Sequence, residues 1–213
     1  ELCRAWAQMG IPFTLCCPPG PIKGCYDVSH FNIVVYGWGK SHVWEQLSLP
    51  LWFSRIKGEK VLVCFTGLGP LLVRKKIMTI HDLAFMANPD WYSRPYRTWY
   101  RMMTPLCAST SMKILTVSEF SKSEIMRRLS MDDEKIRVIY NAVSSRFHAS
   151  ESSRRNAGEV TGEKYILAVS SIDPRKNFSM LLKAFSLIED KNIKLYIVGG
   201  QAHIYSTSIK ELC

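Results

Sequence analysis

Two adjacent cations, Arg175 and Lys176, lie in a short polar segment, residues 170–177, whose composition suits the binding of a phosphate group. An apolar run of strand length, residues 165–169, precedes the segment, and a helical pattern, residues 178–188, follows it. The first turn of a helix has unpaired N–H groups and a positive dipole, to which the two side chains add full charges. This pattern indicates a nucleotide or nucleotide-sugar ligand. A surface loop that is basic without any functional reason explains the pattern equally well.

An imidazole and a carboxylate, His81 and Asp82, follow directly after the apolar residues 77–80, which are expected to form a strand. Ligands of open α/β sheets bind at the carboxyl ends of the strands. An imidazole at that edge exchanges hydrogen bonds with sugar hydroxyls at neutral pH, and Asp82 would orient its ring. The alternative is a His–Asp pair that only caps a helix or packs a loop.

Polar or small residues also follow the other expected strands. Ser118 and Glu119 are candidate contacts to a donor or acceptor, with Glu119 facing the acceptor, although Ser118 and Ser121 fit the start of a helix better. Ser121 and Glu124 have the spacing of a capping box, which predicts a helix beginning there and ending near residue 129. The remaining candidate contacts to a donor or acceptor are Asn141, Ser171, Gly199 and Gly200. A plain turn is the alternative for the glycine pair.

Five segments of the chain, in this order and spacing, resemble the retaining glycosyltransferases of family 4, the group-1 glycosyltransferases. They are IMTIHDL at 77–83, ILTVSEFSK at 114–122, IRVIYNAV at 136–143, SIDPRKN at 171–177 and LYIVGG at 195–200. The resemblance implies a GT-B fold of α/β class, with two Rossmann-like domains. The expected organisation is an acceptor domain over residues 1–148, a small, polar linker over 149–163 and the start of a donor domain over 164–213.

The resemblance also implies chemistry. It assigns His81 to the neighbourhood of the transferred sugar, and Arg175 and Lys176 to the diphosphate of a UDP- or GDP-sugar. The expected acceptor is a glycan or lipid-linked glycan of bacterial cell-surface polysaccharide synthesis. No cofactor and no metal are expected. Two departures from the family pattern bear on the site: Ser170 and Ser171 replace a Gly-Arg or Gly-Ser pair, and Ala142 replaces a glycine.

Family members also carry a first strand with a glycine-rich turn and, in the half-domain after the segment that matches residues 195–200, a Glu-x7-Glu motif; the sequence shows no such strand, and residues 201–213 hold no such motif. We therefore expect a fragment that is inactive alone. A truncated, non-catalytic remnant of a glycosyltransferase is one alternative function.

The positive charge of the chain suggests the other alternative function. The chain of 213 residues has a net charge of +10, and residues 74–101 hold six cations, two anions and six aromatic residues. Cations among Trp and Tyr favour a peripheral contact with an anionic membrane, here through residues 91–101. Single-stranded nucleic acid binding is the competing function, although we expect no nucleic acid partner. A helix with buried aromatic residues and a solvated basic face is the purely structural interpretation.

Cysteine usage bears on the compartment. The seven cysteines are scattered, form no C-x-x-C pair and follow no secretory signal pattern. This favours reduced thiols in the cytoplasm rather than disulfides or a metal site. The expected location is cytoplasmic, with the membrane contact on the inner face.

Overall fold

The computed structural model describes residues 2–21, 31–143 and 164–200. The chain divides into two compact units, which are treated separately below. The first consists of Glu1–Leu83 and Met102–Ser144, and the second of Ala84–Arg101 and Ser145–Cys213. The expected linker, residues 149–163, lies outside the described residues.

Parallel sheets form the first unit. Strands β3 to β6 make one sheet in the order β3-β4-β5-β6, and β1 and β2 make a second, two-stranded sheet. The bounds are β1 Leu15–Cys17, β2 Ile33–Val35, β3 Leu62–Cys64, β4 Lys76–Thr79, β5 Lys113–Thr116 and β6 Ile136–Val138. Met78 pairs with Ile114 in the middle of the sheet, and neither side chain is exposed. Helices cover both faces, as parallel sheets require, so the Rossmann-like α/β prediction is confirmed.

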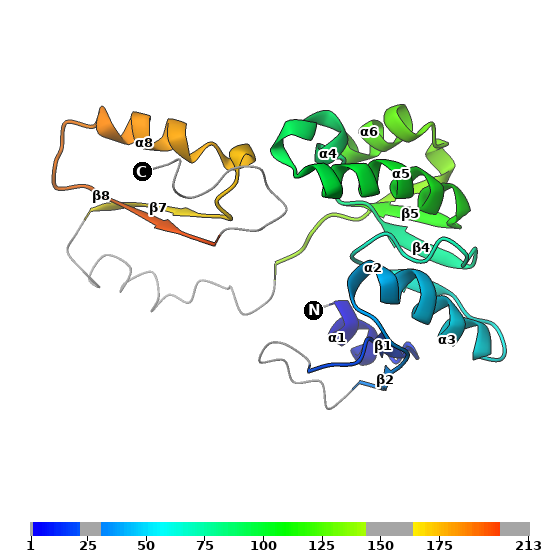
Figure 1. Ribbon diagram of the computed structural model, residues 1–213. Helices are drawn as coiled ribbons and strands as arrows, with labels where there is room; N and C mark the ends of the chain where they lie inside the picture. The colour runs from blue at the N-terminus through cyan, green and yellow to red at the C-terminus, as the bar shows by residue number, and fades with distance from the viewer. Residues whose placement is uncertain (1, 22–30, 144–163, 201–213) are drawn as a thin grey trace. The chain divides into compact units, whose positions relative to one another are not determined.

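The helices of the first unit connect these strands. They are α1 Leu2–Gln8, α2 Ser41–Val43, the π-helical η1 Trp44–Ser48, α3 Leu49–Arg55, α6 Glu119–Leu129 and the 3₁₀ turn η3 Asp133–Lys135. Figure 1 shows α2 and α3 on one side of β4 and β5, and α6 on the other. Pro50 lies in the first turn of α3, where its missing N–H is tolerated, and the wider π turn of η1 directly precedes this helix.

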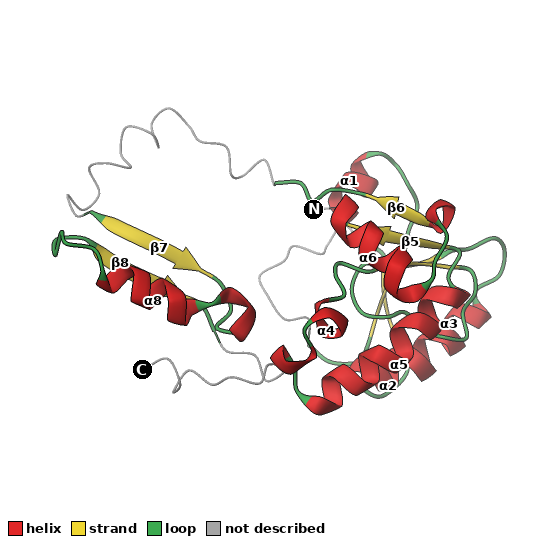
Figure 2. Cartoon of the chain, turned by 90° about the horizontal axis from the view of Figure 1, so that it is seen from above, coloured by secondary structure: helices red, strands yellow, loops and turns green. Residues whose placement is uncertain are grey.

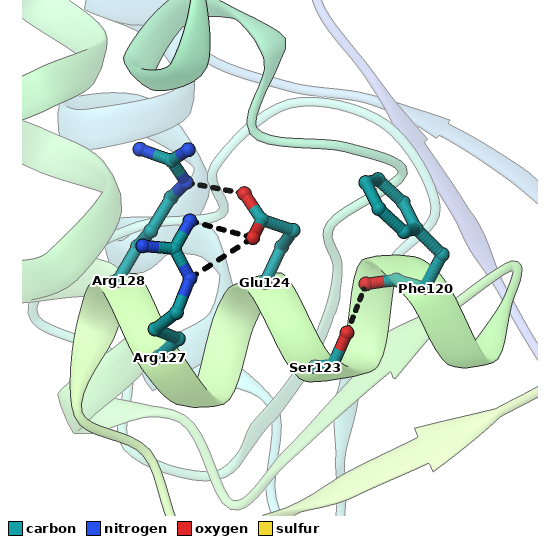
Figure 3. Close-up of polar contacts among 5 residues, drawn as sticks. All are labelled: Phe120, Ser123, Glu124, Arg127 and Arg128. Carbon is teal, nitrogen blue, oxygen red and sulfur yellow. Dashed lines mark hydrogen bonds and ion pairs between the residues drawn. The ribbon is translucent and has the colours of Figure 1, made fainter.

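Helix α6 begins at a different residue from the one that the capping-box pattern predicts. Ser118 is the N-cap, and its hydroxyl accepts a 3.1 Å hydrogen bond from the Ser121 amide. Glu124 is therefore in the second turn, where it bonds Arg127 and Arg128 instead of a free amide (Figure 3). The capping box was the wrong interpretation, whereas the cap at Ser118 and the end at Leu129 are confirmed.

The second unit has two described parts. The first holds α4 Ala84–Ala87, the 3₁₀ turn η2 Pro89–Trp91 and the beginning of α5 Arg94–Thr110, whose later residues belong to the first unit. The second holds β7 Tyr165–Val169, η5 Pro174–Lys176, α8 Phe178–Ser186 and β8 Lys194–Val198. Strands β7 and β8 are parallel, and α8 runs alongside them (Figure 2). The expected strand–helix–strand unit is therefore present.

Candidate functional site

A buried carboxylate organises the loop between β7 and α8. Asp173 accepts hydrogen bonds from the Ser171 hydroxyl at 2.8 Å and from the Arg175 amide at 3.0 Å. Its side chain is completely buried, and the Arg175 Nε lies 3.8 Å from its Oδ1. Charged side chains are rarely buried unless they are paired in this way. Asp173 therefore fixes the shape of the turn that carries the two cations.

The cations of this loop differ in their surroundings. Arg175 is ion-paired with Asp173, so part of its charge is already balanced. Lys176 is exposed to solvent, and its backbone amide donates to the Asp173 carbonyl at 3.1 Å. The loop therefore presents Lys176 as its accessible full positive charge, directly before α8.

Asn177 occupies the N-cap position of α8, but its side chain makes no capping hydrogen bond. Its φ of +51° places it in the left-handed region, which asparagine tolerates better than most residues. The Met180 and Leu181 amides donate to its backbone carbonyl, so the contribution of Asn177 to the helix start comes from its backbone.

The turn after β8 lies against the loop after β7. The Ser170 amide donates to Val198, and the Ile172 amide donates to the Gly200 carbonyl at 2.9 Å. A Cβ atom at Gly199 would lie 1.7 Å from the Ser170 carbonyl oxygen, so no side chain fits there. The structure therefore brings Ser171, Gly199 and Gly200 together at the carboxyl ends of β7 and β8.

In the first unit, His81 is held at two points. Its Nε2 lies 3.0 Å from the Phe65 carbonyl oxygen, and its own carbonyl accepts a 2.9 Å bond from the Ser121 hydroxyl. Because a carbonyl can only accept, Nε2 carries the proton in this bond and Nδ1 of the neutral ring is an acceptor. The ring is exposed at the carboxyl end of β4. It is therefore positioned to accept a hydrogen bond from a hydroxyl.

The other candidates in this unit lie at the same edge of the sheet. Asp82, Glu119 and Asn141 are exposed and follow β4, β5 and β6 respectively. The Ser118 hydroxyl caps α6, which confirms its structural role. No finding tests the ligand roles of these residues, so they stay predictions.

Sequence reasoning missed several residues around these sites. Asp173 and Ser121 hold other residues in place, and no sequence pattern around either residue indicates this role. Phe120 and Tyr140 are 76% and 67% exposed at the starts of the loops or helices after β5 and β6. Aromatic residues directly after a strand are visible in the sequence, but their exposure, which makes them candidate ligand contacts, is visible only in the structure.

The aromatic residues of 91–101 pack against one another. Tyr96 stacks on Tyr92 and on Tyr100, with ring centroids 5.3 Å and 4.3 Å apart, and Tyr92 is buried. This packing gives the rings a structural role, which fits the purely structural interpretation of this segment. Membrane contact through this segment stays a prediction.

Metal binding can be judged for part of the chain. Within residues 2–21, 31–143 and 164–200, no three His, Cys, Asp or Glu side chains are grouped so as to hold a metal ion. The expectation of a metal-independent site stays a prediction.

Comparison with known proteins identifies the fold family. The sequence profile named Glycosyltransferase Family 4 matches residues 1–147, and the profile named Glycosyl transferases group 1 matches residues 149–212. The chain belongs to glycosyltransferase family 4. The Rossmann-like sheets described above fit the GT-B fold of this family.

Curated relatives give a finer comparison for this family 4 chain. It is 29% identical over 155 residues to the O-antigen chain mannosyltransferase RfbU of Salmonella typhimurium, covering 73% of the chain and 40% of the relative. It is 24% identical over 123 residues to O-antigen chain mannosyltransferase B of Escherichia coli, covering 56% of the chain and 32% of the relative. The family 4 chain therefore spans two fifths or less of the length of these relatives. No helix within its described residues is long and apolar enough to cross a membrane.

Proposed function

We propose that this chain is part of a retaining glycosyltransferase that moves a sugar, with mannose the first candidate, from a UDP- or GDP-sugar to a glycan or lipid-linked acceptor. The match of two successive glycosyltransferase profiles over residues 1–212 carries the proposal. The names of the two O-antigen mannosyltransferases favour mannose and a cell-surface polysaccharide.

We assign the residues to two parts of the donor. Lys176 and, second to it, Arg175 bind the donor diphosphate, with Ser171, Gly199 and Gly200 beside them. Fixed cations stabilise the charge that develops on a departing nucleoside diphosphate. We propose that this makes a metal or other cofactor unnecessary. His81 accepts a hydrogen bond from a hydroxyl of the transferred sugar through Nδ1, while Ser121 and Phe65 hold it in place.

We further propose that the reaction takes place in the cytoplasm, at the inner face of the membrane. The cysteines are scattered and odd in number, seven in all, which supports a reducing compartment. Cell fractionation, with soluble and membrane fractions probed separately, checks this location.

The test of this function is sugar transfer by the protein expressed from its complete reading frame. Labelled GDP-mannose, UDP-glucose and UDP-galactose are supplied with glycolipid extracted from cells that lack the gene. We expect label to enter the glycolipid from one donor, with retained anomeric configuration and no loss of rate in EDTA. Absence of transfer from every donor would contradict the function, and loss of transfer in EDTA would contradict the metal-independent mechanism alone.

A further inference from the structure

An apolar groove of about 760 Å³ runs beside the helix of residues 41–55 in the first unit. One wall comes from η1 and α3, with Leu47 and Leu51, and the other from the segment before β4, with Leu72. Leu72 is 80% exposed, and Leu47 and Leu51 are about half exposed. Trp38, 60% exposed, lies at the groove as well. Contiguous exposed apolar surface of this kind marks a binding site more often than ordinary surface.

The polar side chains inside the groove are already engaged. The Gln46 amide donates to the Gly69 carbonyl and accepts from the Leu71 amide, both at 2.9 Å. The Ser54 hydroxyl donates to the Leu51 carbonyl at 2.8 Å. A sugar or a peptide backbone, which needs hydrogen bonds along its length, gains few from these side chains. The interior therefore suits a hydrocarbon chain.

The remaining polar side chains at the groove are all hydrogen-bond donors. They are the indole of Trp38 and the charged ends of Arg74 and Lys75, and both of these cations are exposed. No acidic residue is among the lining residues. Indole rings and long cationic side chains are characteristic of the zone where lipid headgroups meet hydrocarbon. The mouth of the groove is therefore complementary to an anionic headgroup.

We propose that this groove binds an acyl chain of an anionic lipid at a bilayer surface, with the headgroup beside Arg74 and Lys75. An amphiphile with an apolar tail and a negative head satisfies both the lining and the rim. The protein would thus lie on the membrane through the helix of residues 41–55 and the segment before β4, and neither of these two segments would span it.

The groove is separate from the residues assigned to sugar transfer. Arg74 and Lys75 directly precede β4, whereas His81 follows it, so they lie at opposite ends of that strand. Lipid binding at the groove therefore leaves the His81 edge of the sheet accessible. The proposal does not rest on the glycosyltransferase activity, because lipid binding can be measured without a donor.

The test is sedimentation of the chain with sucrose-loaded vesicles, of phosphatidylcholine alone or with one quarter phosphatidylglycerol. We expect binding to the anionic vesicles that weakens as salt is raised, and little binding to the neutral ones. Replacing Arg74 and Lys75 together by glutamine should weaken binding tenfold or more, since each surface cation contributes about fivefold. Leu72→Ser should weaken it as well, at every salt concentration, because it removes exposed apolar area without changing charge.

A matched control removes the same charge elsewhere. Arg94 and Arg101 are exposed cations of the aromatic segment, and their joint replacement by glutamine should lower binding much less. Equal losses in the two double variants, or a loss confined to Arg94 and Arg101, would overturn the groove and favour residues 91–101. Failure of the wild-type chain to bind anionic vesicles would also overturn the lipid-binding proposal. So would a dimer in analytical ultracentrifugation that Leu72→Ser dissociates, because a second copy would then occupy the groove.

Discussion

Lys76, the first residue of β4, has a buried amine with no carboxylate among its hydrogen-bond partners. Its side chain has no exposed surface, and Nζ donates to the Val73 carbonyl at 3.0 Å and to the Thr110 hydroxyl at 2.7 Å. Burial lowers the pKa of this amine from its ordinary value of 10.5, although the nearby thiols of Cys107 and Cys64 act in the opposite direction. The folded protein therefore holds this proton less tightly than the unfolded chain does.

This shift predicts a pH-dependent effect of Lys76→Met. A lowered folded pKa means that the unfolded chain binds more protons as the pH approaches about 10.4, so wild type gains stability over that range. Methionine does not titrate, so the variant lacks this pH-dependent contribution to stability. Relative to Lys76→Met, wild type should therefore become more stable as the pH rises from 7 to 10, as measured by urea unfolding.

The neighbouring Lys75→Met is the control for this measurement. Lys75 is exposed, so its replacement should show no comparable pH dependence. Burial raises the pKa values of the Cys64 and Cys107 thiols to about 12 and about 11, and Lys76 lowers both. Loss of Lys76 therefore raises them further, which adds to the same trend, because a raised thiol pKa removes stability as the pH rises. A stability difference for Lys76→Met that stays constant from pH 7 to 10 would contradict the lowered pKa.

At the scale of elements, helix α6 carries a charged cluster on its exposed face (Figure 3). Hydrogen bonds from Arg128 and then from Arg127 lower the pKa of Glu124 below its ordinary value of 4.5. A lowered carboxylate pKa stabilises the folded state above the unfolded pKa, and this contribution disappears as the pH falls through the folded pKa. Glu124→Gln should therefore lower the melting temperature at pH 7 and make little difference near pH 3.

This effect should be small, because the cluster lies at the surface, with Arg127 exposed, and salt screens surface ion pairs. Glu134→Gln, at an exposed glutamate of η3 with no such cluster, is the control and should leave the melting temperature nearly unchanged at both pH values. A loss for Glu124→Gln that is the same at pH 3 and at pH 7 would show that the arginine contacts do not shift this carboxyl group.

The turn after β8, which contains Gly199 and Gly200, allows a second prediction at the scale of elements. Gly199→Ala would place a methyl group 1.7 Å from the Ser170 carbonyl, so the loop that carries Lys176 must move or β8 must shift. Gly200→Ala adds a methyl group with nothing within 4 Å. Hydrogen exchange of residues 165–173 and 194–198 should accelerate strongly in the first variant and little in the second. Equal exchange in the two variants would mean that the turns do not pack as described.

The strands were predictable from sequence because a parallel sheet covered on both faces needs continuous apolar runs. All eight described strands overlap runs of this kind, among them residues 77–80 and 165–169. The start of α6 was harder to predict, because Ser118 and Ser121 both fit a cap and the choice depends on backbone angles. Ser118 is extended and caps the helix, while Ser121 bonds His81.

The site was predictable in part. The sequence indicates Lys176 and His81 because their chemistry and their place after a strand are both visible in it. The role of Asp173 depends on bonds to both sides of the turn, and aspartate is common in any turn. The groove joins Trp38, Leu51 and Leu72, which are far apart in the sequence, so only the folded chain shows that they meet.

At the scale of the whole molecule, we propose that the second unit binds the donor diphosphate and that His81 of the first unit bonds a hydroxyl of the transferred sugar. The central claim is that the loop of residues 170–177 binds a nucleoside diphosphate through Lys176. The most direct measurement is calorimetric titration of GDP and of UDP into the protein expressed from its complete reading frame. Lys183→Ala, in the same helix region but away from the loop, is the matched control, and Lys183 is exposed like Lys176.

We expect wild type and Lys183→Ala to bind one of the two nucleotides with equal affinity. Lys176→Ala should bind it at least tenfold more weakly, because a charge-assisted contact to phosphate contributes about 1.5 to 3 kcal/mol. Equal affinity of Lys176→Ala and wild type, or no binding of either nucleotide by wild type, would contradict the assignment.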